Sequence, residues 1–187
     1  MQSIVFLIDY VIIVMGDTMK TLFYIIVYGF LGYLLERMIN IIFLARWLDN
    51  SVLFLPIQPM YGIGVVLTLI FYNAVLKHTT INHYLKALLL WMSATVFTMI
   101  SELSSGVLYH RVYGVLLWDY RDTFPVCSLP YICFIPTPIF GVLAAMSVLF
   151  IHPWIESFTK LLPKWVIFVT IGVVFIDYIY TYLEVLI

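Results

Sequence analysis

The stretch TLFYIIVYGFLGYLLERMINIIFLA, residues 21–45, decides the fold class of this chain. It contains two charged side chains, Glu36 and Arg37, and is otherwise mostly apolar. About 20 predominantly apolar residues are enough for a helix to cross the hydrocarbon core of a bilayer. The stretch therefore predicts a transmembrane helix.

The rest of the chain repeats this pattern. Of its 187 residues 64% are hydrophobic and 10% are charged, whereas soluble domains have roughly 45–50% apolar and about 25% charged residues. A soluble domain is therefore excluded. Four further apolar runs lie at residues 57–76, 87–109, 131–151 and 165–187. They are too long for barrel strands and lack a period of two, so we predict an all-α integral membrane protein with five transmembrane helices.

The N-terminal segment, residues 1–18, differs from these five runs. Its apolar stretch is short for a span and contains Asp9. It also lacks the basic start and the small-residue cleavage site of a signal peptide. We expect a short interfacial or partly inserted helix here, followed by a single transmembrane domain over residues 19–187. If the segment crosses the membrane, the number of spans is six.

Positive charges in the short loops indicate the orientation of the chain in the membrane, because cytoplasmic loops carry more Lys and Arg. The bias predicts a cytoplasmic N-terminus for the first strong span, a location in the cell membrane, and outward-facing loops at residues 46–56 and 110–130. The net charge is −1 and no basic tract is present, so we expect membrane lipid and no nucleic acid as a partner. One side holds Lys20, Lys77, Lys86, Lys160 and Lys164, and the other holds Arg46, Arg111 and Arg121.

Polar side chains form stripes along three of the predicted helices. Ionisable residues within spans are costly and usually face the bundle interior or a water-filled cavity. Such stripes can also hold helices together through interhelical hydrogen bonds. We favour a functional role for the two glutamates and leave both roles open for the aspartate. The candidate cavity residues are Glu36 and Asn40 on the first helix, Glu102 and Ser105 on the third, and Asp177 on the fifth.

Two Pro- and Gly-rich segments on the predicted outer side interrupt the helical pattern. The first is PIQPMYGIG, residues 56–64, which contains Tyr61. The second runs to residue 138 and begins with Trp118, Asp119 and Tyr120. Irregular backbone at membrane depth is tolerated where it is buried in protein or lines a cavity. We expect the two segments to fold inward and pack together over the carboxylates; an ordinary Pro-rich helix start and a plain aromatic belt are the structural alternatives.

The two cysteines and a search for catalytic motifs give little information about function. Cys127 and Cys133 lie six residues apart in a loop assigned outward, where a disulfide is permitted. Unpaired thiols in an apolar stretch are the favoured alternative. The sequence has no CxxC or HExxH spacing, no P-loop and no Gly-x-Ser-x-Gly elbow. We therefore expect no metal and no cofactor, and an enzyme is not the favoured reading.

Four motifs together carry a family resemblance. GYLLE (32–36), PIQPMYGIG (56–64), SELSSG (101–106) and WDY (118–120) occur in this order. In this the chain resembles the bacterial family of putative ABC-transporter type IV, or CmpB-like, permeases over about residues 20–150. The positions that match the family are Glu36, Pro59, Tyr61, Gly62, Gly64, Glu102, Gly106, Trp118, Asp119 and Tyr120. The positions expected to have a structural role are Gly32, Pro59, Gly62, Gly64 and Gly106.

The chain departs from the family pattern at two places. The family usually has a Cys-Pro pair where this chain has Gln58 and Pro59, and an Asn and a Gly where it has Cys127 and Pro130. The resemblance implies a divergent, permease-like membrane subunit that acts with a separate ATPase in transport. A membrane-embedded enzyme that uses intramembrane carboxylates and an accessory or scaffolding subunit are the alternatives, and a homo-oligomer is also open.

Overall fold

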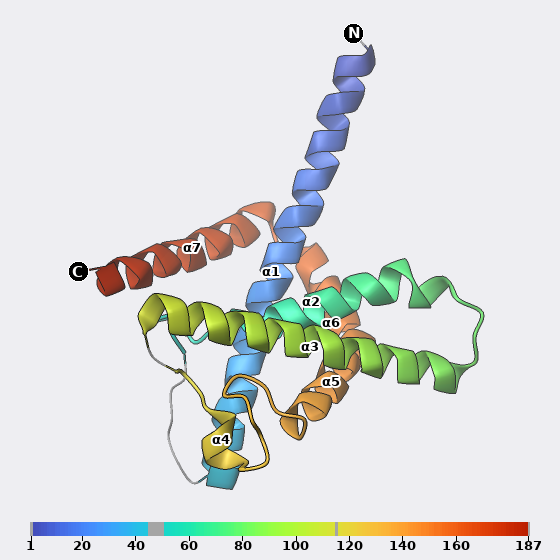
Figure 1. Ribbon diagram of the computed structural model, residues 1–187. Coiled ribbons are helices and arrows are strands. Elements are labelled where there is room, and N and C mark those ends of the chain that lie inside the picture. The colour runs from blue at the N-terminus through green and yellow to red at the C-terminus, as the bar shows by residue number, and fades with distance from the viewer. Residues whose placement is uncertain (1, 45–50, 115, 187) are drawn as a thin grey trace.

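The structure is a computed structural model. It describes the backbone of residues 2–44, 51–114 and 116–186, and the side chains of residues 18–42, 51–114, 116–122 and 124–184. Throughout this described part the regular elements are helical (Figure 1). In chain order they are α1 (Gln2–Leu44), α2 (Pro59–Ala74), the short 3₁₀ helix η1 (Leu76–His78), α3 (His83–Tyr113), α4 (Tyr120–Thr123), α5 (Pro136–Met146), the π-helical turn η2 (Ser147–Ile151), α6 (His152–Leu161) and α7 (Lys164–Leu186).

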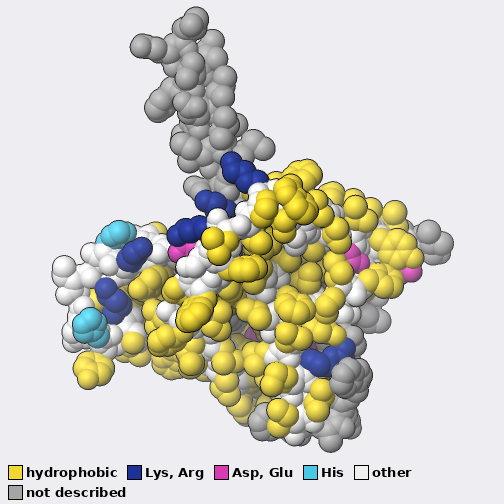
Figure 2. All heavy atoms as spheres, turned by 180° about the vertical axis from the view of Figure 1, so that it is seen from behind, with side chains coloured by type: hydrophobic (Ala, Val, Ile, Leu, Met, Phe, Trp, Pro, Cys, Tyr) yellow, Lys and Arg dark blue, Asp and Glu magenta, His cyan; other side chains and the backbone are white. Residues whose placement is uncertain are grey.

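Five helical stretches in the described residues are long and apolar enough to cross a membrane. The prediction of an all-α multi-pass membrane protein is therefore confirmed. Hydrophobic side chains cover much of the face in Figure 2, as expected for a surface in contact with lipid. The five stretches are Thr18–Ile42, Pro59–His78, His83–Tyr113, Pro136–Leu161 and Lys164–Glu184.

The N-terminal segment does not form a helix of its own. It continues without a break into the first span, so that α1 runs for 43 residues. At 1.5 Å per residue such a helix is about 65 Å long, roughly twice the hydrocarbon thickness. Figure 1 shows its N-terminal part projecting away from the other helices.

Helix α2 lies at the centre of the bundle, between α1 and α3, and α3 packs in turn against α5. The core includes Val66 and Leu69 of α2, Leu90 of α3 and Ala144 of α5. Gly62 allows the closest helix contact, because a Cβ atom there would collide with the backbone carbonyl of Ile25 on α1. In a membrane, small residues of this kind let helix backbones approach closely.

The fourth span begins and ends later than expected. Residues 131–135 are irregular, and the helix starts at Pro136, where a proline is tolerated because the first N–H groups of a helix have no intrahelical partner. It then continues past Pro153 to Leu161. The π-helical turn η2 ends at Ile151, two residues before Pro153. The wider turn accommodates a ring that would otherwise clash with the carbonyl four residues back.

Helix α7 contacts α1 and also contacts residues 53–57 of the connection between α1 and α2. Val174 of α7 lies in a small apolar cluster with Leu53 and Ile57. The described part of the α1–α2 connection therefore packs against α7, and α2 begins directly after it at Pro59.

Candidate functional site

The first carboxylate of the site belongs to Glu36 on α1. The hydroxyl of Tyr61, on the first turn of α2, donates a hydrogen bond to Glu36 Oε2 at 2.8 Å. The Tyr61 ring lies against Gly32, where an added Cβ atom would come to 2.5 Å from the ring. The amide of Gln58 also donates to the carbonyl of Gly29 at 3.1 Å, which fixes the segment before α2 against α1.

The second carboxylate belongs to Glu102 on α3, which is 4% exposed. The hydroxyl of Tyr120 donates to its Oε1 at 2.7 Å, and Thr137 Oγ1 lies 3.5 Å from its Oε2. The neighbouring Ser101 donates to the carbonyl of Met60 and links α3 to α2. Glu102 thus links α3 to Tyr120 at the start of α4 and to Thr137 at the start of α5.

These two carboxylates belong to one cluster. Glu36 lies within electrostatic range of both Glu102 and Tyr120, and Tyr61 lies within range of Tyr120. We call Glu36, Tyr61, Glu102 and Tyr120 the carboxylate–tyrosine cluster, and the end of the bundle that holds it the carboxylate end. The structure therefore brings together four residues that the sequence analysis singled out.

A segment over this cluster, residues 116–135, carries Tyr120 to Glu102, and we call it the lid. Its two arms are joined where the amide of Tyr120 donates to the carbonyl of Pro130 at 3.0 Å, and Trp118 Nε1 donates to the carbonyl of Tyr131 at 3.1 Å. The ring of Tyr131 lies against Gly106 of α3, where a Cβ atom would come to 2.6 Å from it. Its hydroxyl is hydrogen-bonded to His110.

A disulfide between Cys127 and Cys133 closes the lid. Their Cα atoms are 5.3 Å apart, and both side chains are buried. The expectation that favoured unpaired thiols is therefore wrong. The turn at Phe124, whose carbonyl accepts from the amide of Cys127 at 2.9 Å, brings the first cysteine back toward the second.

Asp119 lies in the lid but faces a different partner. Its carboxylate caps the start of α4 by accepting from the amide of Arg121 at 2.9 Å, and it forms an ion pair with the Arg121 guanidinium. The hydrogen bonds from Arg121 hold the pKa of the Asp119 carboxyl below its usual value. The contacts described for Asp119 do not reach Glu102.

Asp177 on α7 lies outside the cluster as well. Its carboxylate is 9% exposed and accepts from the backbone amides of Phe54 and Leu55 at 3.2 and 2.9 Å. It clasps the α1–α2 connection to α7, a structural role that the sequence analysis left open.

The remaining candidates flank these contacts. Asn40 is buried one turn beyond Glu36 on α1, and Ser105 is partly buried one turn beyond Glu102 on α3. Gly64 packs against Thr98, so that α2 and α3 approach closely about one turn before Glu102 on α3. Thr137 was missed by the sequence analysis, and its place in a Pro-Thr-Pro run at a helix start was the one available signal.

The fold and this cluster define a class of protein: a multi-pass α-helical membrane protein with one buried and one half-buried carboxylate, each held by a tyrosine hydroxyl. The model of the family described as "Putative ABC-transporter type IV" (ABC_trans_CmpB) matches residues 23–183. The chain therefore belongs to this family, and the match extends beyond the motifs quoted above. No curated protein and no solved structure matches the chain.

Proposed function

We propose that this chain is a permease-like subunit that acts with a separate ATPase, and that the carboxylate–tyrosine cluster is part of its transport path. Membership of an ABC-transporter family and five apolar helices support a transport-related membrane protein. The observation that carries the finer proposal is the position of Glu36 and Glu102. Carboxylates inside a bundle are costly, and transport sites are a usual reason for keeping them.

The hydrogen bonds of the cluster favour a lid that moves when substrate binds. Each carboxylate accepts from a tyrosine hydroxyl on a different segment, Tyr61 on α2 and Tyr120 in the lid. A substrate that bears a hydrogen-bond donor or a positive charge would compete with these hydroxyls for the carboxylate oxygens. Binding would then loosen the lid, and loss of substrate would restore it.

An accessory or scaffolding subunit is the second candidate. It is favoured by the number of side chains that only connect elements: Ser101 joins α3 to α2, and Asp177 joins α7 to the α1–α2 connection. In that role the cluster would serve assembly alone.

Purification from the native membrane in mild detergent separates the two. A permease subunit should be recovered with an ATPase, and reconstituted vesicles should show ATP-dependent transport. Glu36→Gln and Glu102→Gln should each abolish transport while the complex still assembles, and Glu184→Gln, at an exposed position on α7, should retain it. An assembled complex in which both cluster variants keep full transport would rule out the cluster as a transport site.

We also propose that the carboxylate end faces outward, with the N-terminus of the first span in the cytoplasm. The lysine bias supports this orientation, and so does the disulfide in the lid, because disulfides persist in oxidising compartments. Both native cysteines are paired, so single cysteines can be introduced without removing them. Asp122→Cys should react with an impermeant maleimide in intact cells, and Asn82→Cys only after permeabilisation. The reverse pattern would overturn the orientation.

A further inference from the structure

Exposed lysines gather at the end of the bundle opposite the carboxylate end, and Figure 2 shows basic side chains in a row across this part of the surface. Glu156 lies among them: its Oε1 is 2.9 Å from Lys160 Nζ, and it is within electrostatic range of Lys77. In the described part of the chain these lysines outnumber the carboxylates beside them, so the surface is positively charged. We call it the basic surface, and its members are Lys20 on α1, Lys77 on η1, Lys160 on α6 and Lys164 at the start of α7.

The elements that carry these lysines are fixed to one another. The Tyr28 hydroxyl of α1 is hydrogen-bonded to His152 at the start of α6. One turn earlier on α1, Tyr24 is hydrogen-bonded to Thr159 of the same helix α6. In η1, Leu76 is 2% exposed and belongs to the main apolar core. The charges therefore project from a packed scaffold, and several of them can act on one ligand.

Helix α6 exposes an apolar face beside the basic surface. Trp154, Phe158 and Leu161 lie at i, i+4 and i+7 and so share one side of the helix. Trp154 and Leu161 are 80% and 82% exposed. The face continues back along the same membrane span, where Met146 and Phe150 are exposed at the same spacing of four residues. Helix α6 therefore extends the lipid-facing side of the fourth span as far as the lysines.

A second tryptophan marks the same boundary. Trp165 directly follows Lys164 and is 67% exposed. Tryptophan is enriched where membrane spans meet the headgroup layer, because its ring is apolar and its N–H is polar. Lys164 and Trp165 thus place the basic surface at the level of the lipid headgroups, with the apolar face of α6 on the side of the acyl chains.

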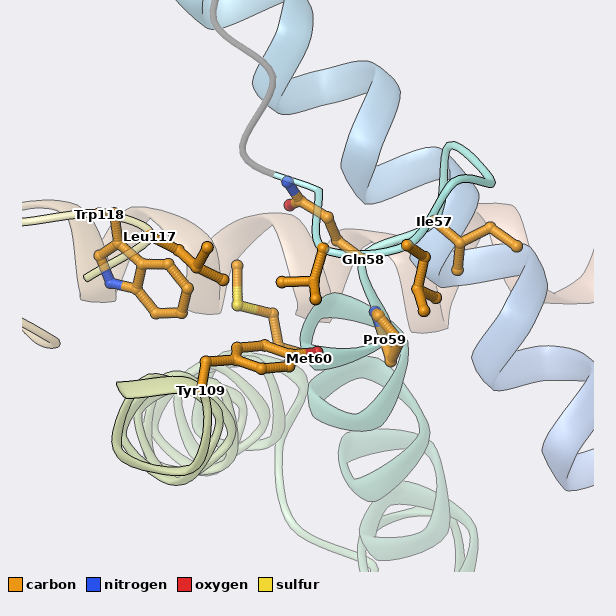
Figure 3. Close-up of a pocket in the computed structure, with 9 residues that line it drawn as sticks. Ile57, Gln58, Pro59, Met60, Tyr109, Leu117 and Trp118 are labelled. Carbon is orange, nitrogen blue, oxygen red and sulfur yellow. The ribbon is translucent and has the colours of Figure 1, made fainter. Parts of the chain in front are cut away.

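A pocket at the carboxylate end is too small for a lipid headgroup. It is lined mainly by apolar side chains, among them Ile57, Met60 and Trp118 (Figure 3). Its volume is about 10 Å³, roughly the space that one water molecule needs. A headgroup therefore fits the open basic surface and not this pocket.

We propose that the basic surface binds the headgroups of anionic phospholipids: Lys77 and Lys160 pair with the phosphate, and Trp154 and Trp165 lie where the headgroups meet the acyl chains. Charge complementarity selects a lipid with net negative charge, since lysines are attracted to an anionic membrane surface. The acidic surface of a soluble partner would match the lysines, but not the apolar face that α6 shares with its membrane span. The inference does not depend on the proposed transport role, because lipid binding can be measured without an ATPase or a substrate.

The test uses the full chain in nanodiscs that contain phosphatidylglycerol, phosphatidylethanolamine and phosphatidylcholine in equal amounts. Native mass spectrometry counts the lipids of each class that stay bound as the nanodisc is removed. We expect phosphatidylglycerol to be retained at least tenfold more than either zwitterionic lipid. Equal retention of the three lipids would overturn the proposal.

Two variants change the charge of the basic surface in opposite directions. Lys77→Gln and Lys160→Gln together should abolish the preference, because each lysine near an anionic surface contributes about fivefold, or about 1 kcal/mol. Both side chains are exposed, so the double variant should fold. Glu156→Gln removes the carboxylate that competes with the phosphate for Lys160, so it should raise the preference. Arg111→Gln, at an exposed position where α3 reaches the carboxylate end, is the control and should leave it unchanged.

The remaining outcomes decide against the lipid assignment. The proposal fails if the double variant keeps the preference, if Arg111→Gln lowers it as strongly, or if Glu156→Gln lowers it. A double variant that keeps phosphatidylglycerol but is no longer recovered with an ATPase from the native membrane would assign the basic surface to protein docking instead.

Discussion

At the carboxylate end, polar side chains find partners far away in the sequence, whereas at the opposite end they mostly find them nearby. Tyr61 and Glu36 are 25 residues apart, Thr137 and Glu102 are 35 apart, and Asp177 binds amides more than 120 residues away. The opposite end, which we call the lysine end, holds Lys20, Lys77, Lys86, Lys160 and Lys164, and Figure 2 shows basic and histidine side chains gathered there.

Contacts at the lysine end are short in sequence. Asn82 caps α3 by accepting from the amide of Leu85, and Lys160 pairs with Glu156 one turn before it. Exceptions among the described residues include Tyr28, whose hydroxyl is hydrogen-bonded to His152 on α6 at 3.0 Å, and Tyr24, which is hydrogen-bonded to Thr159 on α6.

The two ends therefore depend on different kinds of interaction. Local caps and i,i+4 pairs stabilise a helix wherever it lies and contribute little each. The carboxylate end exists only when α1, α2, α3 and the lid are all in place. A change that shifts one of these elements should therefore affect the carboxylate end more than the lysine end.

The largest expected effect comes from Gly62→Leu, which forces α2 away from α1. A side chain there collides with the backbone at Ile25, which cannot rotate out of the way. Overpacking costs about 1–3 kcal/mol and sometimes more, so we expect little folded protein by size-exclusion chromatography. Gly172→Ala is the control, because a Cβ atom there meets nothing within 4 Å. A Gly62→Leu protein with the parent Tm would contradict the packing.

The next effect is that of Tyr120→Phe, which removes the donor to Glu102 and keeps the ring. Leaving a buried acceptor without its donor costs about 1–3 kcal/mol, so we expect a loss of about 2 kcal/mol of stability. A double-mutant cycle with Glu102→Gln measures the coupling. Tyr84→Phe, at a side chain that is 89% exposed on the lysine end, should change nothing. Strictly additive losses in the cycle would show that the bond carries no energy.

Asp177→Leu should have a smaller effect, confined to the α1–α2 connection. The amides of Phe54 and Leu55 lose their acceptor, at a cost of about 1 kcal/mol because water can replace part of it. Hydrogen exchange of residues 51–58 should become faster, and that of residues 76–82 at the lysine end should stay unchanged. Equal rates over residues 51–58 in variant and parent would mean that the clasp is not needed.

The sequence predicted the part of this protein that depends on local composition. Apolar run length is enough to place a span, so the five helices were found with shifts at their ends. The later end of the fourth span has a specific cause: the π-helical turn η2 lets the helix continue past Pro153, beyond the end of the apolar run at residue 151. No spacing rule announces such a turn.

The candidate site was predicted in its members rather than in its contacts. Glu36 and Glu102 stood out because charge is rare in a span, and Tyr61 and Tyr120 because they lie in interrupted segments. The pairing of each tyrosine with one carboxylate depends on how four elements meet, and a single sequence does not contain that geometry. A single sequence also does not distinguish Asp119 and Asp177 from the two glutamates. In the structure Asp119 pairs with the nearby Arg121, and Asp177 accepts from backbone amides of the α1–α2 connection.

The smallest expected effect is that of Asp119→Asn, and it tests whether this residue belongs to the local class. Asn caps a helix about as well as Asp, and an ion pair with an exposed arginine contributes little, so the Tm at pH 7 should barely change. The pKa of Asp119 is lowered from 3.8 by Arg121, so its contribution is present above that pH and is lost as the pH falls through the lowered pKa. Any Tm difference between parent and Asp119→Asn should therefore shrink as the pH falls below 3.8. A well-folded Asp119→Asn protein that loses transport would instead place Asp119 in the working site together with Glu102.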